Sequence, residues 1–218
     1  MMNTDLQYLS DLILSMLHGT VISLELFAFT LALSLPLGLA MSLARISSFK
    51  PLSGAMQVYI WLFRGTPLLL QLFFVYFGLG IAGYSIERFS AAVLAFALNY
   101  SAYFAEIYRS GIQSIDRGQY EAAQVLGLNR RQTMIKIIFP QMLKRVLPPI
   151  SNEVITLIKD TALVYAIGIS ELLRVAKTAA VRDFSFDPFI VAAVFYLLMT
   201  AVIQQFFKWL EGRYAYYR

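Results

Sequence analysis

Polar and charged side chains recur at helical spacing inside two apolar segments of this chain. Around residues 89–112 they are Asn99, Tyr103 and Glu106, and around residues 145–167 they are Asn152, Thr156 and Lys159, with Glu153 and Asp160 beside them. Each set forms a stripe, because residues three and four apart share a helix face. A charge at bilayer depth is costly and marks function by default. Opposite charges neutralise each other there, and a zwitterionic amino acid carries the matching pair, so the stripes are candidates for a substrate path.

Two roles remain open for these side chains. The ammonium group of an amino acid would seek Glu153 or another carboxylate, and its carboxylate would seek Lys159, Arg64 or the backbone N–H groups of a broken helix. Alternatively, Asn99 makes a hydrogen bond between helices, and Lys159 forms a structural ion pair with Asp160. We expect Asn99 and Glu153 either to contact substrate or to pack helices. Lys159 and Asp160 are expected to shape a gate or to break the helix.

The residues needed for covalent chemistry are missing from the sequence. There is no cysteine, which excludes disulfide, zinc-thiolate and redox chemistry, and the single histidine, His18, excludes a histidine-rich metal site. No GxxxxGK[ST] run is present to hold nucleotide phosphates, and no Ser-His-Asp set is visible. We therefore expect no cofactor, no metal and no enzymatic activity, and a separate subunit must supply energy for any uphill work.

Composition predicts a helical integral membrane protein. The 218 residues are 59% hydrophobic and 14% charged, whereas soluble domains are about a quarter charged. Five apolar segments are long enough for a hydrocarbon core of about 30 Å. We predict spans at about 19–44, 52–83 with an interruption at 64–67, 89–112, 145–167 and 188–207.

Three further segments lie outside the predicted spans. In residues 1–18, the apolar side chains at helical spacing are Leu6, Leu9, Ile13, Met16 and Leu17, while Asp5, Ser10 and Asp11 lie elsewhere. This pattern predicts a short amphipathic helix on the membrane surface, not a signal peptide. Residues 170–187 predict a short external helix and loop. Residues 213–218 form a tail in which Tyr214, Tyr216 and Tyr217 are expected to anchor at the inner interface.

The distribution of Lys and Arg predicts the orientation. With the N-terminus outside, twelve basic residues fall inside and four fall outside. The inner ones are Arg45, Lys50, Arg109, Arg117, Arg130, Arg131, Lys136, Lys144, Arg145, Lys208, Arg213 and Arg218, and the outer ones are Arg88, Arg174, Lys177 and Arg182. Because cytoplasmic loops carry the excess of Lys and Arg, the chain is predicted N-out and C-in. The net charge of +5 therefore fits orientation and anionic lipid, with no need for nucleic acid.

The loop at about residues 113–140 contains the run EAAQVLGLNRRQTMIKIIFP, which begins too polar for lipid although apolar segments flank it. Asp116 and Asn129 are placed to cap helices, each with a glutamine three residues later as in a capping box. Gly127 suits the left-handed position that ends the first helix. The small residues of that helix leave room for a partner to approach closely. The run predicts a docking helix at the membrane surface or, alternatively, an ordinary helical hairpin packed on its own bundle.

The set Glu121, Ala122, Ala123 and Gly127, followed by Pro140, resembles the EAA motif of ABC importer permeases. The runs RGTPLL at 64–69 and NEVITLIKDTAL at 152–163 resemble stretches shared by polar amino acid permeases of the histidine, glutamine and arginine type. The resemblance covers most of the chain from about residue 19. It implies a type I importer with an all-α, MetI-like bundle of five spans. Residues 19–212 would form the permease domain, with the EAA loop as a cytoplasmic coupling helix.

The resemblance also implies partners and a location. Such a permease is half of a translocation pore in a bacterial plasma membrane, and the other half is an identical or homologous chain. Two ATPase subunits dock on the coupling loops. A binding protein docks outside with the amino acid, and ATP binding switches the pore from inward- to outward-facing.

Two other functions are weaker matches to the sequence. An ion-gradient-driven secondary transporter of small zwitterions would use carboxylates such as Glu153 and Asp160 for protons. Those folds usually contain internal inverted repeats and more spans, and no repeat is visible here. A membrane enzyme would need a catalytic set, which is missing. Within the importer class, glutamine, glutamate, arginine, histidine and cystine permeases would share these features.

Overall fold

The computed structural model describes residues 2–214, apart from the side chains of residues 2–6 and 9, and this part of the chain is helical without strands. The elements are α1 (Met2–Arg45), α2 (Lys50–Gly65), α3 (Leu68–Phe73), η1 (Phe74–Gly78), α4 (Leu79–Ile81), α5 (Arg88–Gln113), α6 (Arg117–Val125), α7 (Arg130–Thr133), η2 (Met134–Ile138), α8 (Phe139–Asp160), η3 (Thr161–Ile167), α9 (Leu172–Asp183) and α10 (Asp187–Tyr214). The expected all-α class is therefore confirmed.

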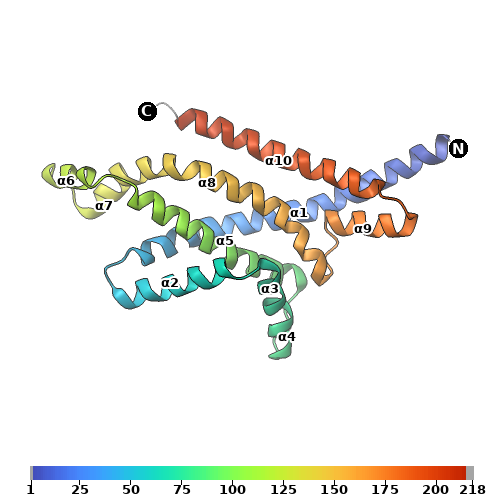
Figure 1. Cartoon of the computed structure of the whole chain (residues 1–218), viewed down its shortest axis with the longest axis horizontal. Coiled ribbons are helices and arrows are strands. Elements are labelled where there is room, and N and C mark those ends of the chain that lie inside the picture. The colour runs from blue at the N-terminus through green and yellow to red at the C-terminus, as the bar shows by residue number, and fades with distance from the viewer. Residues whose placement is uncertain (1, 215–218) are drawn as a thin grey trace.

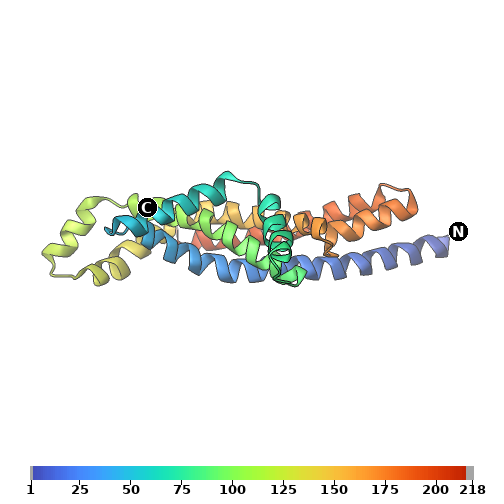
Figure 2. The same ribbon diagram turned by 90° about the horizontal axis from the view of Figure 1, so that it is seen from below.

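The helices form an elongated bundle with two different ends (Figure 1, Figure 2). One end carries α6, α7 and the turn between α1 and α2, and the other carries α9 and the starts of α1 and α10. In both views α1, α5 and α10 run toward the α6 end, whereas α2 and α8 run away from it. The two ends of the described chain consequently lie at opposite ends of the bundle.

The N-terminal segment is not a separate element, which differs from the expected short helix at residues 1–18. It continues without a break into α1, whose 44 residues span about 66 Å. The reason is packing, because Leu12 and Met16 are buried against Leu172 and Ala176 of α9. The side chains of Asp5, Leu6 and Leu9, which belonged to that expectation, lie outside the described residues, as do Tyr216 and Tyr217 of the tail.

The most extensively packed helix pair in the described chain is α1 with α5. A Cβ atom added to Gly38 would lie 2.7 Å from the Cβ of Phe104 and 3.1 Å from the backbone nitrogen of Ala105, so only glycine fits there. Ser34 and Ser42, one turn before and after Gly38, are also fully buried. Small residues of this kind let helix backbones approach closely in a membrane, where close packing takes over from the hydrophobic effect.

The second predicted span is broken as expected. α2 and the segment Leu68–Ile81 meet at an angle of 105°. The break lies at Thr66 and Pro67, whose backbones are both extended. Proline disfavours the helical region for the residue before it, so the break is encoded locally.

Only some of the described helices are both long and apolar enough to cross a membrane. Among the described residues, two helices are long and apolar enough, within Ser10–Arg45 and Asp187–Tyr214, and a third if the bent pair at residues 50–81 counts as one span. The predicted spans at 89–112 and 145–167 coincide with α5 and with α8 plus η3. These helices carry the polar stripes, so their spanning the membrane remains a prediction.

At the end opposite α6, α9 packs against α1 and α10. Tyr8 donates a hydrogen bond to Asp183 at 2.7 Å, and Arg182 donates to both oxygens of the same carboxylate. These hydrogen bonds, led by that of Arg182, lower the pKa of Asp183 to about 2. The helix expected within residues 170–187 is present, and its residue Ala179 is only 6% exposed because it faces α1 and α10.

Candidate functional site

The EAA run folds as the short helix α6 with well-defined ends. Asp116 caps its start by accepting a hydrogen bond from the backbone N–H of Gly118. Gly127 ends it with φ of 71°, as expected, and its N–H donates to the carbonyl of Gln124 while that of Leu128 donates to Ala123. This pair of hydrogen bonds is the Schellman motif. A Cβ atom at Gly127 would meet nothing within 4 Å, so backbone conformation alone favours glycine there.

The second helix of the loop begins with the predicted capping box. The side chain of Asn129 accepts from the N–H of Gln132, and the side chain of Gln132 accepts from the N–H of Asn129, both at 2.9 Å. The capping box expected at Asp116 is incomplete, because the side chain of Gln119 turns away and accepts a hydrogen bond from Gln141 at 3.0 Å. That bond ties α6 to α8.

The two alanines of the motif have different environments. Ala123 is 2% exposed and faces the chain itself, whereas Glu121 and Ala122 face outward. Two apolar neighbours are also exposed, Val125 at 88% and Leu126 at 76%. Sequence reasoning missed these two residues, although an apolar pair beside the capping glycine was a signal for them. Together, Glu121, Ala122, Val125 and Leu126 form what we call the α6 tip.

A hydrogen bond and the helix α8 connect the loop that carries the α6 tip to the interior of the bundle. The guanidinium of Arg145 on α8 donates to the carbonyl of Ser114, just before α6. From there α8 continues to Asp160, and its 22 residues span about 33 Å. One helix therefore connects the loop with the far end of α8.

The far end of α8 lines a cavity of about 470 Å³. Its lining includes five residues of the predicted stripes, Asn99, Tyr103, Glu153, Thr156 and Asp160. The backbone break at residues 66–67 forms another part of its wall. We call this cavity the acidic chamber, since its charged lining residues are both carboxylates.

Asn99, which lines the acidic chamber, makes hydrogen bonds to other helices of the protein. It is 3% exposed, and its amide nitrogen donates to the carbonyl of Phe63 at 3.1 Å and to the side chain of Gln71 at 2.9 Å. Gln71 in turn donates to Phe63 and to both oxygens of Thr66. These bonds hold the ends of the broken helix, which is the helix-to-helix role left open above. Gln71 was missed, although a lone glutamine in the apolar run LLLQLFF is a signal of such a role.

Lys159 and Asp160, which were considered together above, have different environments in the structure. Asp160 accepts a hydrogen bond from Tyr100 at 2.7 Å, and among residues 2–214 no ion pair joins it to Lys159. Lys159 is exposed and does not line the acidic chamber. The two side chains are therefore not paired within 4.0 Å, and their expected role in shaping a gate or breaking the helix stays a prediction.

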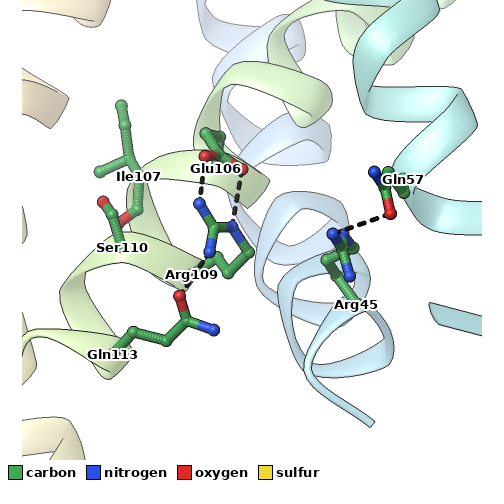
Figure 3. A network of polar contacts seen from close by, with 7 residues as sticks. All are labelled: Arg45, Gln57, Glu106, Ile107, Arg109, Ser110 and Gln113. Atoms are coloured by element: carbon green, nitrogen blue, oxygen red, sulfur yellow. Dashed lines mark hydrogen bonds and ion pairs between the residues drawn. The ribbon is translucent and has the colours of Figure 1, made fainter. Parts of the chain in front are cut away.

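A second cavity, of about 580 Å³, shares Tyr103 with the acidic chamber. Its charged lining residues are Arg45, Arg64, Arg109 and Glu106, and we call it the basic chamber. Arg64 lies here, with its guanidinium 5.4 Å from the centre of the Tyr103 ring. Figure 3 shows Glu106 paired with Arg109 on α5, and Arg45 bonded to Gln57 on α2.

Comparison with known proteins identifies the family of this chain. Residues 34–216 match the family described as the binding-protein-dependent transport system inner membrane component. The chain belongs to this family. It is thus an ABC importer permease, and the resemblance to ABC permeases and to their MetI-like fold is confirmed.

Two curated relatives of this ABC importer permease and one solved structure define the similarity. The chain is 39% identical over 204 residues, 93% of each protein, to the arginine transport system permease protein ArtQ of Bacillus subtilis. It is 34% identical to the putative glutamine transport system permease protein GlnP of Rickettsia bellii, over 89% of this chain and 90% of the relative. The crystal structure of an amino acid ABC transporter with histidines matches with a TM-score of 0.88 and 36% identity, over 95% and 97% of the two chains.

Proposed function

We propose that this chain is the transmembrane permease subunit of an ATP-driven, binding-protein-dependent importer of polar amino acids in a bacterial plasma membrane. The family supports the importer class, and the relatives named for arginine and glutamine transport support the substrate class. The chain forms half of the pore, and an identical or homologous permease chain forms the other half. A binding protein delivers the amino acid at the α9 end.

The observation that carries this proposal is the continuous path from the α6 tip to the acidic chamber. An exposed apolar tip next to a capped, rigid turn suits a groove on a partner. Two ATPase subunits dock there, one on each permease chain, around Glu121, Ala122, Ala123 and Gly127. Their closure on ATP then moves α8, and ATP hydrolysis itself resides in the partner.

The proposed topology has five spans with the N-terminus outside and the C-terminus inside. The alternating directions of α1, α2, α5, α8 and α10 support it, since an odd number of crossings leaves the chain ends on opposite sides (Figure 1). The excess of Lys and Arg on the predicted inner side supports it independently. In this scheme residues 19–212 form the permease domain, residues 113–140 the coupling loop and residues 213–218 the cytoplasmic tail, while residues 1–18 extend the first span outward.

The acidic chamber is the proposed substrate site. The ammonium group of the amino acid lies near Glu153 and Asp160, with Asn99 and Tyr103 as neutral lining. The carboxylate of the amino acid points toward Tyr103, and Arg64 supplies a positive charge from the far side of that ring, in the basic chamber. Lys159, outside the chamber, is left the role of a gate residue facing the second permease chain. Ligand delivery must stabilise one pore state over the other, or no coupling results.

The test is uptake by proteoliposomes that contain the permease, its ATPase and its binding protein. We expect uptake to require internal ATP and no ion gradient. Glu121→Lys and Gly127→Asp are expected to insert normally and to lose ATP-driven uptake, because they place a reversed charge or a strained, bulkier residue at the docking surface. Gly212→Asp is the matched control, since Gly212 is also free of neighbours within 4 Å but lies in α10.

Uptake that follows an imposed proton or sodium gradient without ATP would support the secondary transporter instead. Normal ATP-driven uptake by both coupling variants would remove the docking role from α6.

A further inference from the structure

The basic chamber carries more positive charge than its own carboxylate can balance. Glu106 is occupied by Arg109, whose Nε donates to it at 2.8 Å. Arg45 and Arg64 line the same chamber, and among the described residues neither has a carboxylate within 4.0 Å. Two guanidinium groups thus line one open cavity, and neither forms an ion pair with a carboxylate of the described chain.

Neutral partners hold these guanidinium groups in place. Arg45 donates to Ser53 at 2.8 Å and to Gln57 at 3.0 Å, as Figure 3 shows for Gln57. Arg64 rests over the Tyr103 ring. A guanidinium held this way keeps donors available for a carboxylate, which it binds in bidentate geometry. The neighbouring Trp61, 72% exposed, adds an aromatic wall.

The basic chamber lies nearer to the coupling loop than the acidic chamber does. Along α5, Glu106 and Arg109 follow Tyr103 in the direction of α6, whereas Asn99 and Tyr100 precede it. A molecule that leaves the acidic chamber past Tyr103 toward the α6 end therefore meets the basic chamber next.

We propose that the basic chamber is a second binding station, which takes the carboxylate of an amino acid between Arg45 and Arg64 on the α6 side of Tyr103. The identity of the ligand as an amino acid rests on the proposed function, whereas the carboxylate chemistry rests on the chamber alone. An amino acid that accumulates inside the cell keeps this station filled. Filling it slows import by blocking the next molecule, so the permease itself responds to its product.

Trp61 provides a direct readout of the station. The chain contains two tryptophans, so Trp209→Phe leaves Trp61 as the only one. We expect sodium acetate and L-glutamine to change the Trp61 fluorescence of the full chain in lipid nanodiscs, and L-glutaminamide, which lacks the carboxylate, to leave it unchanged. Potassium chloride and potassium phosphate at equal ionic strength distinguish a carboxylate site from a general anion site.

Matched variants locate the response. Arg45→Gln and Arg64→Gln should each weaken acetate binding by about tenfold or more, because a charge-assisted hydrogen bond is lost. Arg88→Gln removes an arginine at the start of α5 that bonds Tyr76 and does not line the basic chamber, and it should bind acetate normally. Equal responses to glutamine and glutaminamide, equal responses to chloride and acetate, or unchanged binding in both chamber variants would each overturn the proposal.

Transport separates this proposal from the proposed function. Preloading proteoliposomes with the transported amino acid should slow initial ATP-driven uptake, and Arg45→Gln should relieve that inhibition. Glu153→Gln should impair uptake while leaving the Trp61 response to acetate intact. If uptake proves independent of ATP but the Trp61 response persists, the ATP-driven importer mechanism is refuted and the second binding station is retained. If uptake requires ATP but Trp61 does not respond to acetate, only the second binding station is refuted.

Discussion

Truncation of the α6 tip should weaken ATPase binding without affecting the fold. Val125 and Leu126 are the exposed apolar residues of the tip, and nothing in the described chain covers them. Leu126→Ala and Val125→Ala shorten them without changing charge or backbone conformation. Because both side chains face outward in the free permease, each variant should unfold within about 0.5 kcal/mol of the unmodified protein.

The size of the effect follows from the surface that docking would bury. Each methylene buried contributes about 0.8 kcal/mol. Leu126→Ala removes three carbon atoms from a side chain that is 76% exposed, which gives about 1.8 kcal/mol, or about a twentyfold weaker Kd. Val125→Ala removes two from a side chain that is 88% exposed, which gives about 1.4 kcal/mol, or about tenfold.

Affinity is measured by titrating the purified ATPase subunit onto the permease in nanodiscs, and thermal unfolding of the permease is recorded in parallel. Val181→Ala is the matched control, because Val181 is also an exposed valine, at 66%, but lies on α9 at the opposite end. Unchanged Kd in both tip variants, or an equal loss in the α9 control, would refute the docking argument. A loss of thermal stability in the tip variants would show that the side chains of Val125 and Leu126 are not exposed in the free permease.

Three further outcomes are expected. Glu153→Gln keeps the shape of a side chain that lines the acidic chamber. It should raise the substrate concentration needed for half-maximal uptake by about ten- to a hundredfold, because roughly 1.5–3 kcal/mol of charge-assisted hydrogen bonding is lost. Unchanged uptake per folded molecule together with lower stability would show that Glu153 is a packing residue. Cysteine at Asn129 should react only from the cytoplasmic side and cysteine at Val181 only from outside, since both positions are exposed and the chain has no native cysteine; reversed labelling would overturn the orientation. The pKa of Asp183 lies below its usual 3.8, so its stabilising contribution is present above about pH 4 and is lost as the pH falls toward 2; the difference in Tm between the unmodified protein and Asp183→Asn should shrink over that interval, and a constant difference would contradict this.

Features governed by a few neighbouring residues were predictable from the sequence. The left-handed glycine at 127, the capping box of Asn129 with Gln132 and the break before Pro67 all depend on backbone sterics and hydrogen bonds within one turn. The helices at the predicted spans also followed from apolar segment length. The EAA motif could likewise be identified from the sequence, because its residues lie close together in the chain.

The tertiary structure alone decided which face of each helix meets which neighbour. Lys159 and Asp160 are neighbours in the sequence, yet they differ in the structure. The packing of α8 against α5 places Asp160 where it accepts a hydrogen bond from Tyr100, and it leaves Lys159 exposed. Met16 was predicted to lie on the apolar face of a surface helix, yet in the structure α9 covers it together with Leu12. Spacing along the chain fixes which side chains share a face, whereas the partner of that face is set by contacts between distant segments. The two chambers that share Tyr103 exist because distant segments meet on α5: α1 and α2 line the basic chamber with it, whereas α3, α8 and η3 line the acidic chamber with it.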